Sequence, residues 1–148
     1  MLCYVSRPAP THMLLAALLF FTSIVSVMAS PLDPFRWEHR ILLIKAESPE
    51  VAAAYIGELE RFAGEVDERD LVWFVADPDY LQTNKPEALK KTSRDQLNKL
   101  ITEQTLPGER VILVGKDGGT KGRYDRLDLP AVFLRIDGMP MRRAEMER

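Results

Sequence analysis

Cysteine is almost absent from this sequence, and histidine is scarce. The 148 residues include one cysteine, Cys3, and two histidines. Cys3 lies in an N-terminal segment that we interpret below as a cleaved leader, so the chain left after cleavage contains no cysteine. That chain has no disulfide, no thiolate nucleophile and no thiolate metal ligand. Its stability must come from the hydrophobic core alone, and thiol redox activity is excluded for it.

A large excess of charge of one sign is also missing. The sequence has 20 basic and 22 acidic residues, a net charge of −2. Arg7 is the only charged residue before Asp33, so 19 basic and 22 acidic residues remain after cleavage, a net charge of −3. Such a near-balanced charge is not typical of proteins that bind nucleic acid or anionic membranes. We therefore expect no nucleic-acid partner.

One long apolar run occurs in the sequence, MLLAALLFFTSIVSVM at residues 13–28. Arg7 precedes it, and small or β-branched residues occupy the −3 and −1 positions before Ser30. A positive start, an apolar centre and a small-residue exit are typical of a secretory signal peptide. The sequence therefore predicts a signal peptide at residues 1–29, with cleavage between Ala29 and Ser30.

An uncleaved membrane anchor is the alternative interpretation of this run. A bilayer core about 30 Å thick needs about 20 apolar residues, whereas the run has 16 and no cluster of Lys or Arg follows it. Met13 is an alternative start to Met1, which would remove Arg7 from the leader. The signal peptide predicts an exported protein, periplasmic in a Gram-negative bacterium and otherwise secreted. Membrane contact is expected only through an uncleaved leader.

The predicted mature chain, residues 30–148, is long enough for one domain with a core of its own. Its 119 residues lie within the usual size of a single domain. The elements predicted below place the core at about residues 36–138. Residues 139–148 are then a charged, methionine-containing tail.

Apolar runs and one turn motif predict four strands. The runs within residues 40–45 and 71–76 suit strands that are buried on both faces. Residues 110–114 form a third strand, and the Asp-Gly pair that follows favours a tight hairpin. Residues 120–124 are the short, polar return strand, which is expected at an edge of the sheet.

Capping residues predict three helices. Ser48, followed by a proline, opens the first helix, and Gly64 is its predicted end. Ser93 opens the second helix within a weak capping box. Asp128 opens the third, and Gly138 ends it.

The predicted elements follow the order β-α-β-α-β-β-α. Alternating units need parallel strands joined by crossover helices, and the final hairpin adds an antiparallel pair. Among small α/β folds this is the order of a thioredoxin-like sandwich, although other layered α/β folds share its first units. The sequence therefore predicts an α/β fold of the thioredoxin-like type, preceded by a signal peptide.

Four motifs resemble those of one protein family. They are Trp37-x-x-Arg40 before the first strand, Trp73–Val75 within the second, Val114–Gly119 at the hairpin and Ile136–Arg142 at the end. Over about residues 33–146 the chain resembles the domain of unknown function found in small exported bacterial proteins and in vertebrate extracellular sushi-repeat and coiled-coil-domain proteins. The resemblance implies an exported location and a thioredoxin-like fold related to peroxiredoxins. It implies no particular chemistry, because no activity is established for the family.

Two kinds of nucleophilic catalysis lack the residues they need. A thioredoxin-like enzyme carries its reactive cysteine just after the first strand, where the helix dipole lowers the pKa of the thiol. In this chain that place is residues 46–49, where we expect Ser48 to be a helix cap. His39 is the only histidine of the mature chain, and no Gly-x-Ser-x-Gly motif accompanies it. We interpret His39 as a surface or anchoring residue.

Asp77 and Asp79 are close in the sequence and suggest a site for a hard cation, together with Asp67 or Asp117. Calcium binds six to eight oxygens, and no loop here provides an EF-hand-like series. A turn after the second strand explains the Asp-Pro-Asp sequence without an ion. We therefore predict no metal and no cofactor. Asp77 stays a candidate ligand-binding residue, because α/β sheets bind ligands at the carboxyl ends of their strands.

Basic residues gather around the predicted hairpin and in the tail. Lys116 beside two glycines is similar to an anion-binding loop, but the spacing is not that of a P-loop. A solvated hairpin with a glycine-rich turn explains the same residues without a ligand. The functional interpretation is contact with an anionic partner, such as a polysaccharide or an acidic protein. The candidate binding residues are Asp77, Lys116, Asp117, Lys121, Arg123, Arg142 and Arg143.

Three classes of function stay open for this sequence. The missing nucleophile and metal ligands favour an exported, non-catalytic binding or adaptor module with an unknown protein or anionic envelope partner. The first alternative is a cysteine-independent enzyme whose carboxylates and basic residues meet near Asp77 and Lys116. The second is a structural envelope protein. Convergence of Asp77 and Lys116 in one pocket would favour the enzyme, and their dispersal on turns would count against it.

Overall fold

The computed structural model describes residues 29–90 and 92–148. The predicted signal peptide, residues 1–29, lies outside the described residues except for Ala29. Cys3 also lies outside them. Among the described residues, no helix is both long enough and apolar enough to cross a membrane.

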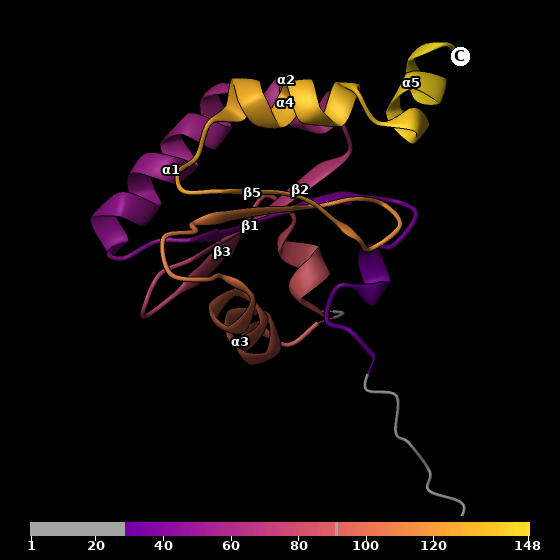
Figure 1. Cartoon of the computed structure of the whole chain (residues 1–148). Coiled ribbons are helices and arrows are strands. Elements are labelled where there is room, and N and C mark those ends of the chain that lie inside the picture. Colours follow the sequence, from indigo (N-terminus) through magenta and orange to yellow (C-terminus); the bar gives the residue numbers. More distant parts are fainter. Residues whose placement is uncertain (1–28, 91) are drawn as a thin grey trace, which may run out of the picture.

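A five-stranded mixed sheet lies at the centre of the molecule (Figure 1). The strands are β1 (Arg40–Lys45), β2 (Leu71–Ala76), β3 (Leu81–Thr83), β4 (Val111–Val114) and β5 (Thr120–Tyr124). They lie in the order β3-β2-β1-β4-β5. β1 and β2 are parallel, and the other three neighbouring pairs are antiparallel. The α/β class predicted from the sequence is therefore confirmed.

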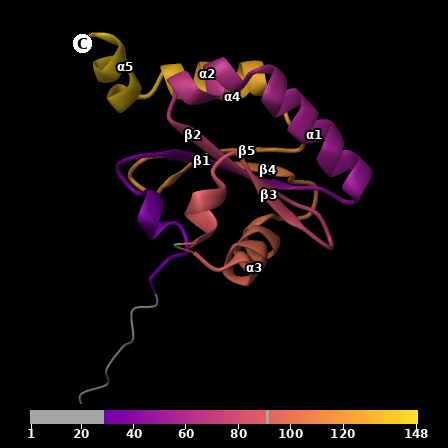
Figure 2. The same cartoon turned by 180° about the vertical axis from the view of Figure 1, so that it is seen from behind.

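Helices cover both faces of this sheet. They are α1 (Pro49–Arg61), α2 (Ala63–Glu68), α3 (Arg94–Gln104), α4 (Leu129–Asp137) and α5 (Pro140–Met146), with two short 3-10 helices at Asp33–Phe35 and Pro86–Lys90. Figures 1 and 2 show α1, α2 and α4 over one face and α3 over the other. α5 lies at the end of α4, beyond one end of the strands. The molecule thus has three layers, with the sheet between two layers of helix.

Two of the predicted helix caps form the expected hydrogen bonds. The Ser48 hydroxyl accepts from the backbone N–H of Val51 at 3.4 Å, at the start of α1. The Asp128 carboxylate accepts from the backbone N–H of Ala131 at 3.0 Å, at the start of α4. Gly138 ends α4 as predicted. These capping residues fix where α1 begins and where α4 begins and ends.

Alternate residues of β1 enter two separate cores. Leu42 and Ile44 pack on the face covered by α1 and α4, whereas Ile41 and Leu43 pack on the face covered by α3. This division follows from the period of two along a strand. A strand between two helix layers must be apolar on both faces, which explains the continuous apolar run in the sequence.

The first helix does not end at Gly64, so that prediction is wrong. α1 ends at Arg61, Phe62 leaves helical geometry with φ −105° and ψ 25°, and Gly64 lies inside α2. Phe62 packs on the core, with its ring centroid 6.1 Å from that of Phe133. An exposed glycine inside a helix costs only about 1 kcal/mol. The inward packing of Phe62 therefore marks the break, and the glycine does not.

The polar stretch after β2 contains a strand that the sequence did not predict. β3 pairs with the carboxyl-terminal half of β2, and Leu81, its first residue, is buried in the core on the α3 face. Asn84 continues the edge where β3 ends. Its side chain accepts from the N–H of Trp73 and donates to the carbonyl of Leu71, both at 3.0 Å. One side-chain amide thus satisfies backbone groups that a longer strand would otherwise pair.

The residues predicted to be a tail, 139–148, form a helix for most of their length. α5 begins at Pro140, where the missing N–H of proline costs no helical hydrogen bond. Arg142 on this helix is buried, with 5% of its surface exposed. A short charged helix of this kind is held by contacts with the rest of the protein, because isolated helices of this length are not stable in water.

Truncation of Leu42 tests the central position of β1. Leu42 has 0% exposure, and we expect Leu42→Ala to lower the free energy of unfolding by about 3–4 kcal/mol through the cavity it leaves. Leu134→Ala on α4 is the matched control. Leu134 is 77% exposed, so its truncation should change stability by less than about 0.5 kcal/mol. Urea denaturation followed by circular dichroism measures both, and equal losses would contradict this packing.

Candidate functional site

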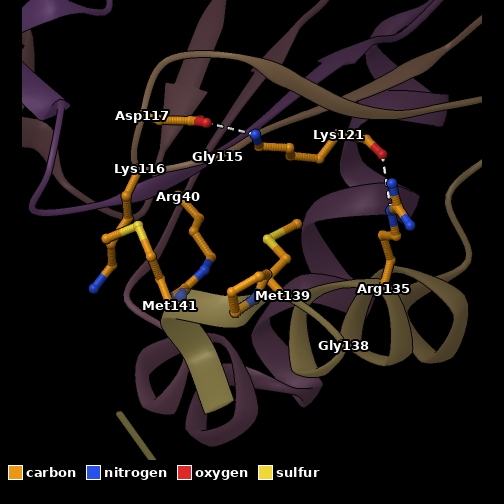
Figure 3. Close-up of a pocket in the computed structure, with 10 residues that line it drawn as sticks. Arg40, Gly115, Lys116, Asp117, Lys121, Arg135, Gly138, Met139 and Met141 are labelled. Atoms are coloured by element: carbon orange, nitrogen blue, oxygen red, sulfur yellow. Dashed lines mark hydrogen bonds and ion pairs between the residues drawn. The ribbon is translucent and has the colours of Figure 1, made fainter. Parts of the chain in front are cut away.

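A cavity of about 400 Å³ opens between the turn that joins β4 to β5 and the junction of α4 with α5 (Figure 3). Its charged lining consists of four cationic side chains and one carboxylate. Methionine and proline side chains from the start of α5 form another part of its wall. The charged residues are Arg40, Lys116, Lys121, Arg135 and Asp117.

The β4–β5 turn has a backbone that holds its side chains over the cavity. Gly118 has φ +83°, a left-handed conformation that glycine adopts without strain. A Cβ atom at Gly115 would lie only 2.5 Å from Cε of Lys121, so a larger residue there would displace the Lys121 side chain from its position across the turn. Lys121 Nζ then lies 2.5 Å from Oδ2 of Asp117. This hydrogen bond and one from the N–H of Gly119 lower the pKa of the Asp117 carboxyl.

Arg40, the first residue of β1, is almost completely buried at 1% exposure. Its Nη1 donates to the backbone carbonyl of Arg69 at 2.9 Å. Its Nη2 donates to both carboxylate oxygens of Glu145, at 3.1 and 3.3 Å. The third donor position, Nε, is buried and has no hydrogen-bond acceptor within residues 29–90 and 92–148. A charged donor without an acceptor at such a position is uncommon in folded proteins.

Lys116 is the second buried cation at the site, with 8% exposure. Its Nζ donates to Oδ2 of Asp70 at 2.8 Å and to Oε1 of Glu145 at 2.7 Å. Glu145 therefore joins Lys116 to Arg40. Burial raises the pKa of the Glu145 carboxyl, but the hydrogen bond from Lys116 and the charges of Arg40 and Lys116 outweigh that effect and lower the pKa.

Arg142 attaches the other side of α5 to the domain. Its guanidinium donates to the backbone carbonyl of Glu68 at 2.9 Å and to the carboxylate of Glu68 at 2.6 Å. It also donates to Asp137 at 3.4 Å, and Arg69 holds the same carboxylate at 2.7 Å. The hydrogen bond from Arg69 is the main cause of the lowered pKa of Asp137. Arg142 therefore has a structural role beside the cavity, and its donors are already engaged.

The structure brings together three of the predicted binding residues, Lys116, Asp117 and Lys121. Arg143 is exposed on α5. Arg123 is on β5, where it donates to Glu109 at 2.7 Å and to the carbonyl of Gln104 at 2.8 Å. Of the seven predicted binding residues, Lys116, Asp117 and Lys121 are the ones that line this cavity together.

Asp77 and Lys116 lie at opposite ends of the sheet, which contradicts a shared catalytic pocket. Asp77 follows the carboxyl end of β2, beside the end of β1, whereas Lys116 follows Val114, which pairs with Ile41 at the start of β1. The six residues of β1 span roughly 20 Å. Oδ1 of Asp77 accepts from the backbone N–H groups of Asp79 and Tyr80, at 2.8 Å each, in the turn that the sequence predicts.

Three residues of the site were not among the sequence candidates. Arg40 was named only in the motif Trp37-x-x-Arg40 and as part of the first predicted strand. Arg135 lay within the last predicted helix without an assigned role, and Glu145 lay in the predicted tail. The motif Trp37-x-x-Arg40 contained the only hint, because a charged residue at the start of a doubly buried strand needs a partner. The identity of that partner, 105 positions away, has no local signature.

His39 and Ser48, the two side chains considered for nucleophilic catalysis, lie outside the cavity. No group of three His, Cys, Asp or Glu side chains in residues 29–90 and 92–148 is placed to hold a metal ion. His39 is half-buried, with Nε2 3.4 Å from Nζ of Lys85. Burial, and then the positive charge of Lys85, lower the pKa of His39. Ser48 is occupied as a helix cap.

Removal of the Glu145 charge tests the ionic attachment of α5. Glu145→Gln leaves two buried cations with less compensation, and we expect a loss of about 3 kcal/mol in the free energy of unfolding at pH 7. The native pKa of Glu145 is lowered, so its contribution is complete above the unfolded pKa, about 4.3, and is lost as the pH falls through the native value. The stability difference between wild type and variant should therefore shrink below pH 4. Urea denaturation at pH 7, 5 and 3 measures it.

Glu147→Gln is the control for this variant, because Glu147 is exposed at the end of the same helix. Its effect on stability should be less than about 0.5 kcal/mol at each pH. Equal effects of the two substitutions at pH 7, or a Glu145 effect that grows in acid, would contradict the ionic attachment.

Comparison with known proteins identifies the family of this chain. No curated protein and no solved structure matches it. A protein-family model described as "Domain of unknown function (DUF4174)" matches residues 31–145. The matched range includes every strand, helices α1 to α4 and α5 as far as Glu145, and so contains the whole cavity. The chain therefore belongs to the DUF4174 family of domains of unknown function.

Proposed function

We propose that this protein is an exported, non-catalytic binding module on a thioredoxin-like scaffold, and that it holds an anionic ligand in the cavity beside α5. The observation that carries the proposal is the charge of the lining. Four cationic side chains surround the cavity with one carboxylate, and Nε of the buried Arg40 has no acceptor among the described residues. The cavity volume of about 400 Å³ lies in the range of small-molecule sites.

The strand order supports the thioredoxin-like part of the proposal. Without β3, the sheet order is β2-β1-β4-β5, with β1 and β2 parallel and β4 antiparallel to β1. α1 and α4 lie on one face and α3 lies on the other. These are the pairings expected of a β-α-β unit followed by a β-β-α unit. On this scaffold β3 and α5 are additions, and α5 is the addition that closes the cavity.

The residues at the thiol position of this scaffold support a function without redox chemistry. Ser48 occupies the start of α1 and caps it. A serine hydroxyl is not ionised at neutral pH and forms no disulfide, so it cannot replace a thiolate. The small cavity of about 180 Å³ at this end is lined by Ala46, Asp77 and their neighbours, and Asp77 is engaged in its turn. The cationic cavity at the other end is the better site for a ligand.

Arg135 is the lining residue best placed to contact a ligand. Its Nε donates to the backbone carbonyl of Lys121 at 2.9 Å. Within the described residues it has no carboxylate partner, in contrast to Arg40, Lys116 and Lys121. A guanidinium without a carboxylate is a ready partner for an anion, because its paired donors match two acceptor oxygens.

Export is tested by the N-terminus of the protein after secretion. In a Gram-negative host we expect the protein in the periplasmic fraction, with Ser30 as its first residue, because small residues precede that position. Ala29→Arg should slow cleavage and hold the longer chain at the membrane. Fractionation and N-terminal sequencing measure both. A cytoplasmic protein that retains residues 1–29 would contradict the prediction.

Binding at the cavity is tested by titration calorimetry with small probes of opposite charge. We expect the purified protein to bind an anion, hexanoate or inorganic phosphate, and not the cation hexylammonium. Lys121→Gln combined with Arg135→Gln should weaken anion binding at least tenfold, because each substitution removes a charged donor. Lys99→Gln on α3 is the control, since Lys99 is exposed on the opposite face and should leave binding unchanged.

Two results would contradict this function. Anion binding that survives the double substitution would place the ligand elsewhere. Reproducible peroxidase or reductase turnover by the purified protein, without added metal, would favour an enzyme.

A further inference from the structure

We infer that the ligand of the cavity is a small organic acid, with a single carboxylate on a short apolar body. This inference rests on the proposed function and goes further by naming the class of anion. It is carried by the charge balance of the lining, by the donors that remain available and by the apolar wall that α5 provides.

The charges around the cavity leave a single positive charge in excess. Its four cations are Arg40, Lys116, Lys121 and Arg135. Three carboxylates are paired with them. Asp117 holds Lys121, Asp70 holds Lys116, and Glu145 bridges Lys116 and Arg40. A monoanion completes this balance, whereas a phosphate dianion would leave a net negative charge in a partly enclosed site.

The donors around the cavity suit a carboxylate. The Arg40 guanidinium already donates to one carboxylate, since its Nη2 lies 3.1 and 3.3 Å from the two oxygens of Glu145. The Nε–H of the same guanidinium has no acceptor within the described residues, although Arg40 is 99% buried and lines the cavity. Arg135 contributes a second guanidinium from α4. A carboxylate with two oxygens matches the paired donors of the Arg135 guanidinium, and Arg40 adds its positive charge to the lining.

The wall beside Arg40 is apolar. Figure 3 shows the side chains of Met139 and Met141 next to Arg40 at the start of α5, across the cavity from the Lys121–Asp117 pair. Met141 is 42% exposed, although it is a large apolar residue. Methionine side chains are unbranched and adapt to apolar ligands of different shape. A ligand placed between the two sides meets charge at one end and thioether and methylene groups at the other.

The size of the cavity limits the apolar body. A volume of about 400 Å³ holds roughly a dozen water molecules at ~30 Å³ each. An acid with about six to eight carbons has a comparable or smaller number of heavy atoms. Fully extended long-chain fatty acids would have to project out of the opening.

Titration calorimetry on the purified protein with four probes tests this ligand class. The probes are hexanoate, acetate, hexan-1-ol and inorganic phosphate. We expect hexanoate to bind at least tenfold more tightly than acetate, because the longer chain buries four more methylene groups. Hexanoate should also bind at least tenfold more tightly than phosphate, and hexan-1-ol should show no measurable binding.

Matched methionine variants separate the apolar wall from the charges. Met141→Ser should weaken hexanoate binding about fivefold and leave acetate binding unchanged, since only the longer chain reaches the thioether. Met146→Ser is the control, because Met146 is exposed on α5 and does not line the cavity. Thermal unfolding confirms that both variants are folded. Amide chemical shifts of Gly115 and Gly138 report directly whether hexanoate enters the cavity.

The possible failures are distinguishable. Phosphate binding tighter than hexanoate, with loss in Arg135→Gln, would overturn the organic-acid class and leave the anion-binding function standing. Equal binding of hexan-1-ol and hexanoate would overturn the need for charge, and with it both proposals. Both proposals would also be overturned if none of the anions binds, or if none changes the amide chemical shifts of Gly115 and Gly138.

Discussion

The contact of Glu145 with Arg40 and Lys116 is the interaction on which the site depends. It joins the start of β1, the β4–β5 turn and α5, three parts of the chain that are far apart in sequence. Both cations are more than 90% buried. Burial of a charge costs several kcal/mol unless a partner compensates it, so the two cations require the carboxylate. The same carboxylate fixes α5 at the edge of the cavity, because a helix of seven residues has little stability of its own.

The arginines near α5 differ in whether a carboxylate of the protein pairs with them. Arg142 and Arg69 share Asp137, and Arg142 also holds Glu68, so their donors are consumed within the fold. Arg135 precedes Asp137 by two positions on α4 but has no carboxylate partner among the described residues. The difference indicates that Arg142, although buried and basic, stabilises the helix, whereas Arg135 is available to a ligand.

Local features of the structure were predictable from the sequence, and the convergence of distant residues was not. Strands β1, β2, β4 and β5 follow from apolar runs and an Asp-Gly turn, because burial and turn geometry act over a few residues. Lys116 and Asp117 lie in that turn and Lys121 follows it near the start of β5, so their proximity was predictable too. Glu145 was assigned to a tail, because its role depends on a contact across 105 positions. Asp77 was overestimated, since its carboxylate is used by its own turn.

The two ends of the sheet differ in whether their polar side chains are engaged within the fold or line a cavity. At the carboxyl ends of β1 and β2, the side-chain oxygens of Ser48 and Asp77 accept hydrogen bonds from backbone N–H groups. Ser48 caps the start of α1, and Asp77 stabilises its own turn. Little reactivity remains where a thioredoxin-like enzyme would hold its thiolate. At the other end, α5 borders a cavity lined by Arg40 and Arg135. The buried Nε of Arg40 has no acceptor among the described residues, and the Arg135 guanidinium has no carboxylate partner among them. In the proposed binding module, the ligand site therefore lies at the end of the sheet that α5 borders, away from the thiol position of the proposed scaffold.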